Sequence, residues 1–99
     1  MPPDAGQRFE REMACTEAEW LRWLPMAIGQ RDWQHEPGRA SVTIGSGALE
    51  LQWRVVEPLA IALLRLPRLL VSFQFSDVRA SERQAFMKRF DLYMQRGGG

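Results

Sequence analysis

One cysteine and one histidine are the only residues of the sequence that could pair as a sulfur nucleophile and its base. Cys15 stands just before an expected helix, whose positive dipole end would lower the pKa of a thiol. No motif places His35 beside it, so we interpret Cys15 as an unpaired thiol without a catalytic partner. A single cysteine also excludes an internal disulfide and a cysteine-built zinc site.

Carboxylates are the next candidates, because two of them in one cleft can perform acid–base chemistry. Asp77 falls at a strand-to-helix connection, where acids commonly serve turns, and Asp91 falls on the polar face of an expected helix. One histidine and dispersed acids give no metal-ligand spacing. The sequence therefore predicts no catalytic residue, no metal site and no cofactor, and a protein that is not an enzyme.

Arginines of the second half could bind phosphate groups. Arg54, Arg65 and Arg68 are the candidate contacts for a nucleic acid or a phosphorylated ligand. The net charge of the chain is only +1, and the expected open face of the sheet carries no aromatic platform for stacking bases. Binding of nucleic acid or of a phosphorylated ligand is therefore the alternative function, not the favoured one.

The element after Cys15 is predicted to be a short helix. Thr16 and Glu19 have the spacing of a capping box, and apolar residues follow at helical spacing. Pro25 is expected to end or kink this helix near Leu24. Residues 29–39 have the composition of a loop.

Alternating runs then predict strands. Residues 40–44 and 48–57 flank Gly45-Ser46-Gly47 and form a hairpin, which Pro58 is expected to end. Residues 59–66 are apolar on both faces, so a strand is favoured there over a short helix. A turn at 66–69 leads to a last strand over 69–76.

The fold expected is of the α+β class. It is a two-layer sandwich with a four-stranded, mainly antiparallel sheet, an N-terminal and a C-terminal helix on one face, and the order α-β-β-β-β-α. Residues 1–14 are predicted to be a flexible lead, 15–96 a single α+β domain that ends in a helix, and 97–99 a flexible glycine tail. Met1 and Met13 are both candidate starts of translation, and the strand order stays open.

Two features suggest contact with a protein. Trp33 lies in the polar loop, where it could anchor an interface, although a loop pinned to the core explains it equally well. If Leu59, Ile61 and Leu63 face the helices, an apolar strip faces outward, consisting of Ala60, Ala62 and Leu64. Such a strip is commonly covered by a partner or a second copy. We therefore expect a small non-catalytic accessory or protein-interaction domain, with a homodimer as one form.

Two further expectations concern location and origin. The first residues lack the apolar core of a secretory signal, and the apolar stretch 59–75 is interrupted by Arg65, Pro67 and Arg68. The sequence thus predicts a soluble, cytoplasmic protein with no membrane contact. No family resemblance emerges from these motifs. An enzyme whose site is completed by residues of a partner is the third alternative.

Overall fold

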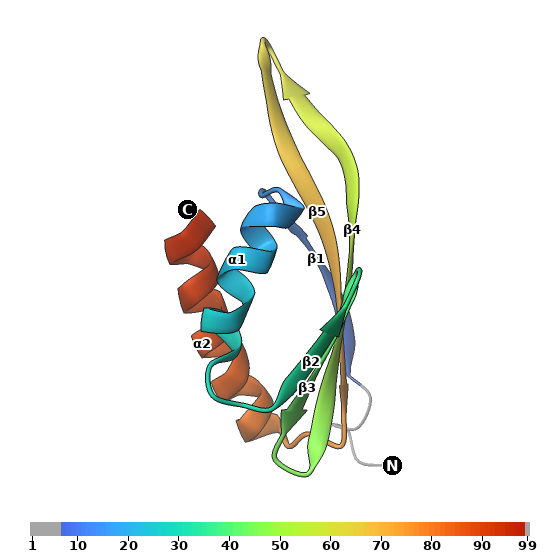
Figure 1. Ribbon diagram of the computed structural model, residues 1–99, viewed down its shortest axis with the longest axis vertical. Helices are drawn as coiled ribbons and strands as arrows, with labels where there is room; N and C mark the ends of the chain where they lie inside the picture. Colours follow the sequence, from blue (N-terminus) through green and yellow to red (C-terminus); the bar gives the residue numbers. More distant parts are fainter. Residues whose placement is uncertain (1–6, 99) are drawn as a thin grey trace.

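The computed structural model describes residues 7–98, which form a five-stranded sheet with two helices on one of its faces (Figure 1). The elements in chain order are β1 (Arg8–Met13), α1 (Glu17–Ile28), β2 (Trp33–Glu36), β3 (Arg39–Ile44), β4 (Gly47–Ile61), β5 (Leu64–Ser76) and α2 (Ala80–Gly98). The strand order is β1-β5-β4-β3-β2, and each neighbouring pair is antiparallel. The α+β class, the antiparallel sheet and the placement of both helices on one face are confirmed.

The core lies between the helices and the sheet. Alternate residues of the central strands are buried there, as the period of a half-buried strand requires: Ala40, Val42, Ile44, Leu49, Leu51, Trp53, Leu69, Val71, Phe73 and Phe75. The ring of Phe90 in α2 makes edge contacts with Trp20 at 5.9 Å and with Phe73 at 5.5 Å between centroids. These aromatic contacts join both helices to the sheet.

The first helix begins as predicted and ends later. Thr16 accepts from the amide of Glu19 at 3.1 Å, and the Glu19 carboxylate accepts from the amide of Thr16 at 2.9 Å, which completes the capping box. Of the two effects predicted for Pro25, to end or to kink the helix near Leu24, the first is wrong, because α1 continues to Ile28. Ile28 is fully buried, so the packing of the last turn outweighs the hydrogen bond that proline cannot donate.

Two edge strands replace segments that were expected to be irregular. The prediction of a flexible lead is wrong over Arg8–Met13, which pairs with β5, while residues 1–6 lie outside the described part of the chain. Phe9 stacks on Phe73 with ring centroids 4.7 Å apart, and this contact holds β1 to the core. The loop expected over 29–39 contains β2, which pairs with β3. A chain starting at Met13 would leave out most of β1.

The third of the four predicted strands does not exist as a separate strand. Pro58 lies inside β4 beside a register shift between Val56 and Leu59, and Pro67 lies inside β5. The chain turns at Ala62, which has a positive φ of 53°. Residues 59–66 are therefore the end of one long β4–β5 hairpin, and the order is β-α-β-β-β-β-α. Neither proline has a strand on its outer side, so the missing N–H groups leave no ladder bond unmade.

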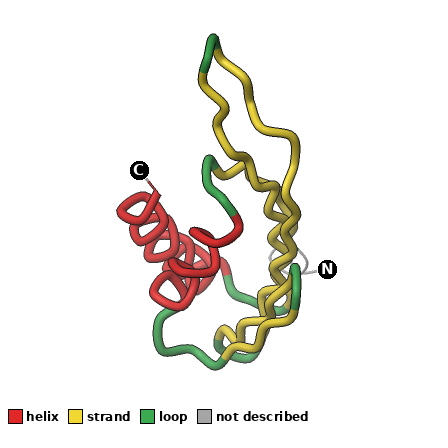
Figure 2. The backbone as a smooth tube through the Cα atoms, turned by 45° about the horizontal axis from the view of Figure 1, so that its top comes forward, coloured by secondary structure: helices red, strands yellow, loops and turns green. Residues whose placement is uncertain are grey.

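One end of the molecule is formed by the β4–β5 hairpin alone. The β4–β5 hairpin extends well past both helices, which Figures 1 and 2 show from two directions, and it accounts for the 48 × 27 × 24 Å extents of the molecule. Helix α2 continues through Gly97 to Gly98, so the flexible glycine tail predicted for 97–99 begins too early, and Gly99 lies outside the described residues. No helix within residues 7–98 combines the length and the apolar character that crossing a bilayer requires.

Candidate functional site

The end of the β4–β5 hairpin projects from the body as an arm, which we define as residues 55–68. Along β4 the last buried residue is Trp53, whose indole N–H donates to the Glu17 carboxylate at the start of α1 at 2.9 Å. The next residue on the same face, Val55, is 64% exposed. Helix cover therefore ends at Trp53, and no residue of the arm belongs to the buried core cluster.

The register of the hairpin gathers four aliphatic side chains on one face of the arm. Leu59 lies opposite Leu66, and Ile61 lies opposite Leu64. Opposed residues of an antiparallel pair share a face, so these four residues form one cluster, which we call the apolar face. On β5, Leu64 and Leu66 continue the series Arg68, Leu70 and Ser72, whereas Leu69, Val71 and Phe73 face the helices. The apolar face is therefore continuous with the open face of the sheet.

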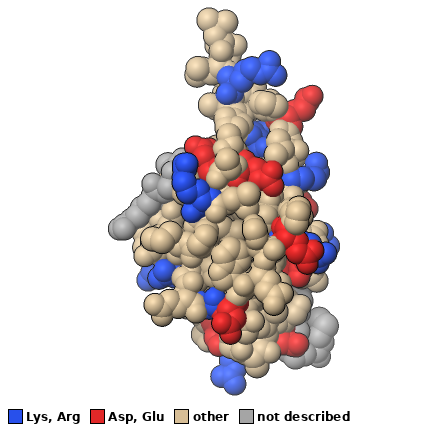
Figure 3. Space-filling view, in the orientation of Figure 1, with Lys and Arg blue, Asp and Glu red and all other residues tan. Residues whose placement is uncertain are grey.

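The apolar face is exposed along its whole length. The exposed fractions are 43% for Leu59, 51% for Ile61, 63% for Leu64 and 39% for Leu66, and Leu63 at the tip is 99% exposed. Single exposed aliphatic residues are common on proteins, whereas a contiguous group of five is not. Figure 3 shows only uncharged atoms at the very end of the projection, with a basic side chain directly below it and both signs of charge interspersed over the body.

The opposite face of the arm has a different character. Ala60 lies opposite Arg65, and these two side chains point away from the apolar face. Pro67 follows Arg65 on this face, where it is partly covered. The two faces of the arm thus differ, since one carries four aliphatic side chains and the other carries Ala60, Arg65 and Pro67, with Val55 at its base.

The edges of the arm are poorly suited to further strand pairing. Pairing with β3 ends at Gln52 on one side, and pairing with β1 ends at Leu69 on the other. Beyond these points each strand carries a proline, Pro58 in β4 and Pro67 in β5, and β4 is also irregular before Leu59. Proline and bulges are devices that stop an added strand from pairing with an edge. The arm therefore offers its face rather than its edges.

Arg68, the charged residue that follows the apolar face on β5, is already engaged. Arg68 donates to the carbonyl oxygen of Glu57 at 2.8 Å and forms an ion pair with Glu12 of β1 at 3.1 Å. These contacts hold the arginine at the base of the arm. A partner that covers the apolar face therefore need not supply a carboxylate for Arg68.

The residues predicted for partner contact fall at two separate places. Ala60, Ala62 and Leu64 all lie exposed in the arm, but only Leu64 belongs to the apolar face. The expectation that Leu59, Ile61 and Leu63 face the helices is wrong, because the helices do not reach the arm. These residues are recognisably apolar in the sequence, but no sequence pattern showed at which residue the helices stop covering the sheet.

Trp33 is the first residue of β2 and lies far from the arm. It is half-buried against the core, and its ring centroid is 5.7 Å from that of His35. Trp33 pairs with Val42 of β3, and Val42 in turn pairs with Leu49 of β4. The arm residue Leu59 lies ten residues beyond Leu49 on β4, which corresponds to about 33 Å of strand. Trp33 and the arm are therefore separate surfaces.

The three arginines proposed as phosphate contacts do not share a face. Arg54 lies opposite Leu70 on the open face of the sheet, where Arg68 also lies with its two protein contacts. Arg65 points from the other face of the arm. The structure thus brings two of the three guanidinium groups to one face and separates the third.

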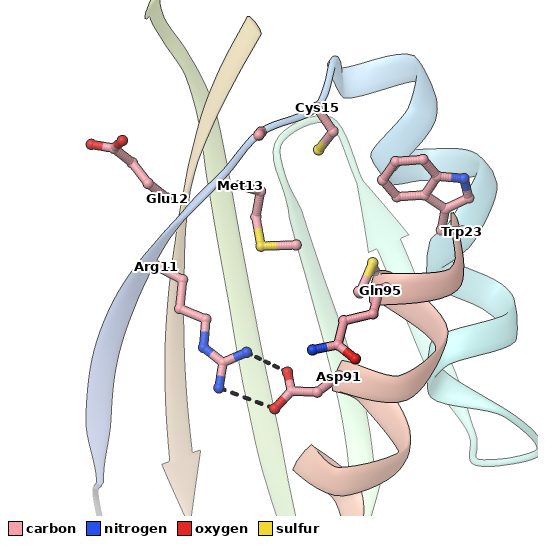
Figure 4. A pocket seen from close by; sticks show the side chains of 9 residues that line it. Arg11, Glu12, Met13, Cys15, Trp23, Asp91 and Gln95 are labelled. Atoms are coloured by element: carbon pink, nitrogen blue, oxygen red, sulfur yellow. Dashed lines mark hydrogen bonds and ion pairs between the residues drawn. The ribbon is translucent and has the colours of Figure 1, made fainter. Parts of the chain in front are cut away.

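A cavity of about 320 Å³ lies between β1, α1 and α2 (Figure 4). Its wall includes Arg11, Met13, Cys15, Trp23 and Asp91. Figure 4 shows Arg11 and Asp91 pointing toward each other, and the two groups form an ion pair with a second contact of 3.3 Å. The charges of Arg11 and Asp91 therefore satisfy each other and join β1 to α2, and Glu12, the third charged residue of the wall, pairs with Arg68. Within residues 7–98 no group of three or more possible metal ligands lies together.

The Cys15 thiol in this wall is a poor nucleophile. Burial, assisted by the charge of Glu19, raises its pKa to about 11 from an ordinary value of 9.0. His35 is not among the residues that line the cavity. The expected effect of the adjacent helix terminus is therefore outweighed by loss of water from the sulfur.

Alkylation of Cys15 should consequently be slow while the chain is folded. A rise of about two units in the pKa lowers the thiolate population near pH 8 about 100-fold, so iodoacetamide should react at least that much more slowly than in urea. Mass spectrometry of timed samples measures both rates. Equal rates in the folded and the unfolded chain would contradict the buried position of the thiol.

Comparison with known proteins identifies no family for this chain. A scan against protein-family models gives no match to this chain, and a search of the curated proteins gives none either.

Proposed function

We propose that this protein is a small non-catalytic interaction module, and that its contact surface is the β4–β5 arm. The observation that carries the proposal is the contiguous exposure of Leu59, Ile61, Leu63, Leu64 and Leu66 beyond the helices. A two-stranded hairpin outside a sheet is only marginally stable in water, so an arm of this length gains from being covered.

The size of the surface supports this role. A large aliphatic side chain carries ~100 Å² of apolar surface, so the five residues expose on the order of 300 Å² together. Burial of one such side chain contributes about 1.5–3 kcal/mol before the costs of association. A patch of this size is comparable to the largest apolar patch of an ordinary monomer, and such patches are often functional.

A non-catalytic role agrees with the cavity described above. Its arginine and carboxylate neutralise each other, and its thiol is held in the protonated state at neutral pH. Location in the cytoplasm and the absence of a membrane partner remain predictions from the sequence. Binding of phosphate groups by Arg54, Arg65 and Arg68 remains the alternative, although the three side chains lie on two faces.

A photo-crosslinking experiment tests the proposal without knowledge of the partner. Benzoylphenylalanine is placed at Leu63, and in a matched variant at Thr43, which is exposed on β3 in the body. Cells expressing each full-length variant are irradiated, and adducts are separated by mass. We expect a discrete adduct from position 63 and none from position 43, because only the arm carries the apolar surface.

The possible adducts have distinct meanings. Any discrete adduct that is specific to position 63 supports the arm as the contact surface, whatever its mass. Absence of an adduct from position 63, or an equal pattern from position 43, would remove the arm from the proposed function. Circular dichroism of both purified variants verifies that each is folded.

A further inference from the structure

We infer that the partner of the apolar face is a second copy of this chain, packed face against face about a two-fold axis. This inference rests on the proposed function, since it names the partner of the same surface. Two other candidate sites on the molecule, the cavity and the arginines, support an inference less well. The cavity is closed by its own Arg11–Asp91 pair, and Arg54 and Arg65 lie on different faces.

The first step concerns the mode of contact. A partner strand adds to a sheet through free N–H and C=O groups at an edge. Pro58 and the irregular pairing before Leu59 interrupt one edge of the arm, and Pro67 interrupts the other. Contact through the flat face of the hairpin is therefore favoured, as in the packing of one sheet on another.

The second step concerns charge. In a two-fold contact the same patch lies on both sides, so any unpaired charge in it would meet its own copy. The four residues of the apolar face are uncharged, and Arg65 points from the opposite face. Arg68 at the margin is bound to Glu12 and to the Glu57 carbonyl. Arg54 lies one residue pair beyond Arg68 on the open face, outside the apolar face. Two copies can therefore meet over the four aliphatic residues without opposing like charges.

The third step concerns area. Two apolar faces together present on the order of 400 Å² of aliphatic surface, and the two Leu63 side chains at the tips raise this to on the order of 600 Å². About 60% of an interface is apolar, so a contact that includes both tips would bury about 1,000 Å² in total. This is the size at which specific protein interfaces begin. The dimer should therefore form reversibly, with a dissociation constant in the micromolar range.

A lipid surface fits the arm less well. Hairpin tips and helices that enter anionic membranes carry free basic residues around their apolar residues. Here Arg68 is bound to protein groups, Arg65 lies on the other face, and Glu57 adds a negative charge to the arm. Membrane binding is therefore kept as an outcome of the test.

The experiment uses the purified full chain. Sedimentation velocity from about 1 μM to about 200 μM follows the mass of the protein in solution. Ile61→Ser, which changes one side chain of the apolar face, should weaken the dimer at least tenfold.

A crosslinking experiment tests the arrangement of the two copies. In a Cys15→Ala background, Ile61→Cys and Ala60→Cys place single thiols on opposite faces at neighbouring positions. A short bismaleimide should link copies through position 61 and not through position 60. Circular dichroism verifies the fold of each variant.

Each result decides the inference. A concentration-dependent dimer that is weakened by Ile61→Ser and linked through position 61 supports it. A dimer linked equally through position 60 overturns the face-to-face arrangement. A monomer up to the highest concentration overturns the second copy. If the chain is monomeric, an adduct between position 63 and another protein would still support the proposed function. Binding of the monomer to phosphatidylserine vesicles assigns the surface to lipid instead and also overturns the inference.

Discussion

A variant without the arm is expected to fold normally and to lose the association. Val56 and Arg68 lie opposite each other, so residues 57–67 can be replaced by Asn-Gly, which forms a two-residue hairpin turn. None of the removed side chains belongs to the buried core, so the free energy of unfolding should change by no more than about 1 kcal/mol. Urea denaturation measures this change, and sedimentation measures the association.

Comparison with Ile61→Ser distinguishes loss of the contact residues from loss of support for the core. The shortened chain should be monomeric, Ile61→Ser should associate at least tenfold more weakly, and the shortened chain should retain the ion pair between Arg68 and Glu12. A loss of more than about 3 kcal/mol in the shortened chain would show that the arm supports the core. Retention of the association would place the contact on the body.

Replacement of Gly47 by alanine should destabilise the fold strongly. Gly47 begins β4, and a Cβ atom there would lie 2.3 Å from the carbonyl oxygens of Ser76 and Asp77. These atoms belong to the connection from β5 to α2, where Asp77 has a positive φ of 57°. The backbone must move to admit the methyl group, so we expect a loss of about 3 kcal/mol in the free energy of unfolding, measured in urea.

Gly38→Ala is the matched control for this variant. Gly38 has a positive φ of 78°, and a Cβ added there would lie 3.6 Å from the Trp53 carbonyl oxygen, which is an ordinary contact. Its cost should be about 1–2 kcal/mol and arise from the backbone conformation alone. A smaller loss for Gly47→Ala than for Gly38→Ala would contradict the close approach at the start of β4.

The sequence predicted the centre of the fold better than its margins. Alternation over 40–44 and 69–76 placed every inward residue of those strands correctly, because a central strand is buried on one face along its length. Edge strands lack this signal. In β1 the inward positions include Arg11, which reaches Asp91 on α2, so the run looks polar although it pairs fully with β5.

The candidate site was only partly predictable for a related reason. The sequence indicated that residues 59–66 are too apolar for an open surface, and Leu64 was correctly placed on the outward face. Prolines at 58 and 67 were interpreted as strand ends, which is the usual rule for a strand with neighbours on both sides. Where helix cover ends depends on contacts such as Glu17 with Trp53, which join residues distant in the sequence.

The prolines and the irregular pairing in the arm have a consequence for how large any assembly can grow. A long apolar hairpin with open edges is the kind of element from which cross-β fibres grow, because each added strand presents a fresh edge to the next. Here Pro58 and Pro67 interrupt that route, whereas two matched faces satisfy each other and leave nothing to extend. The arm thus carries, beside the aliphatic residues proposed for contact, two prolines that limit polymerisation.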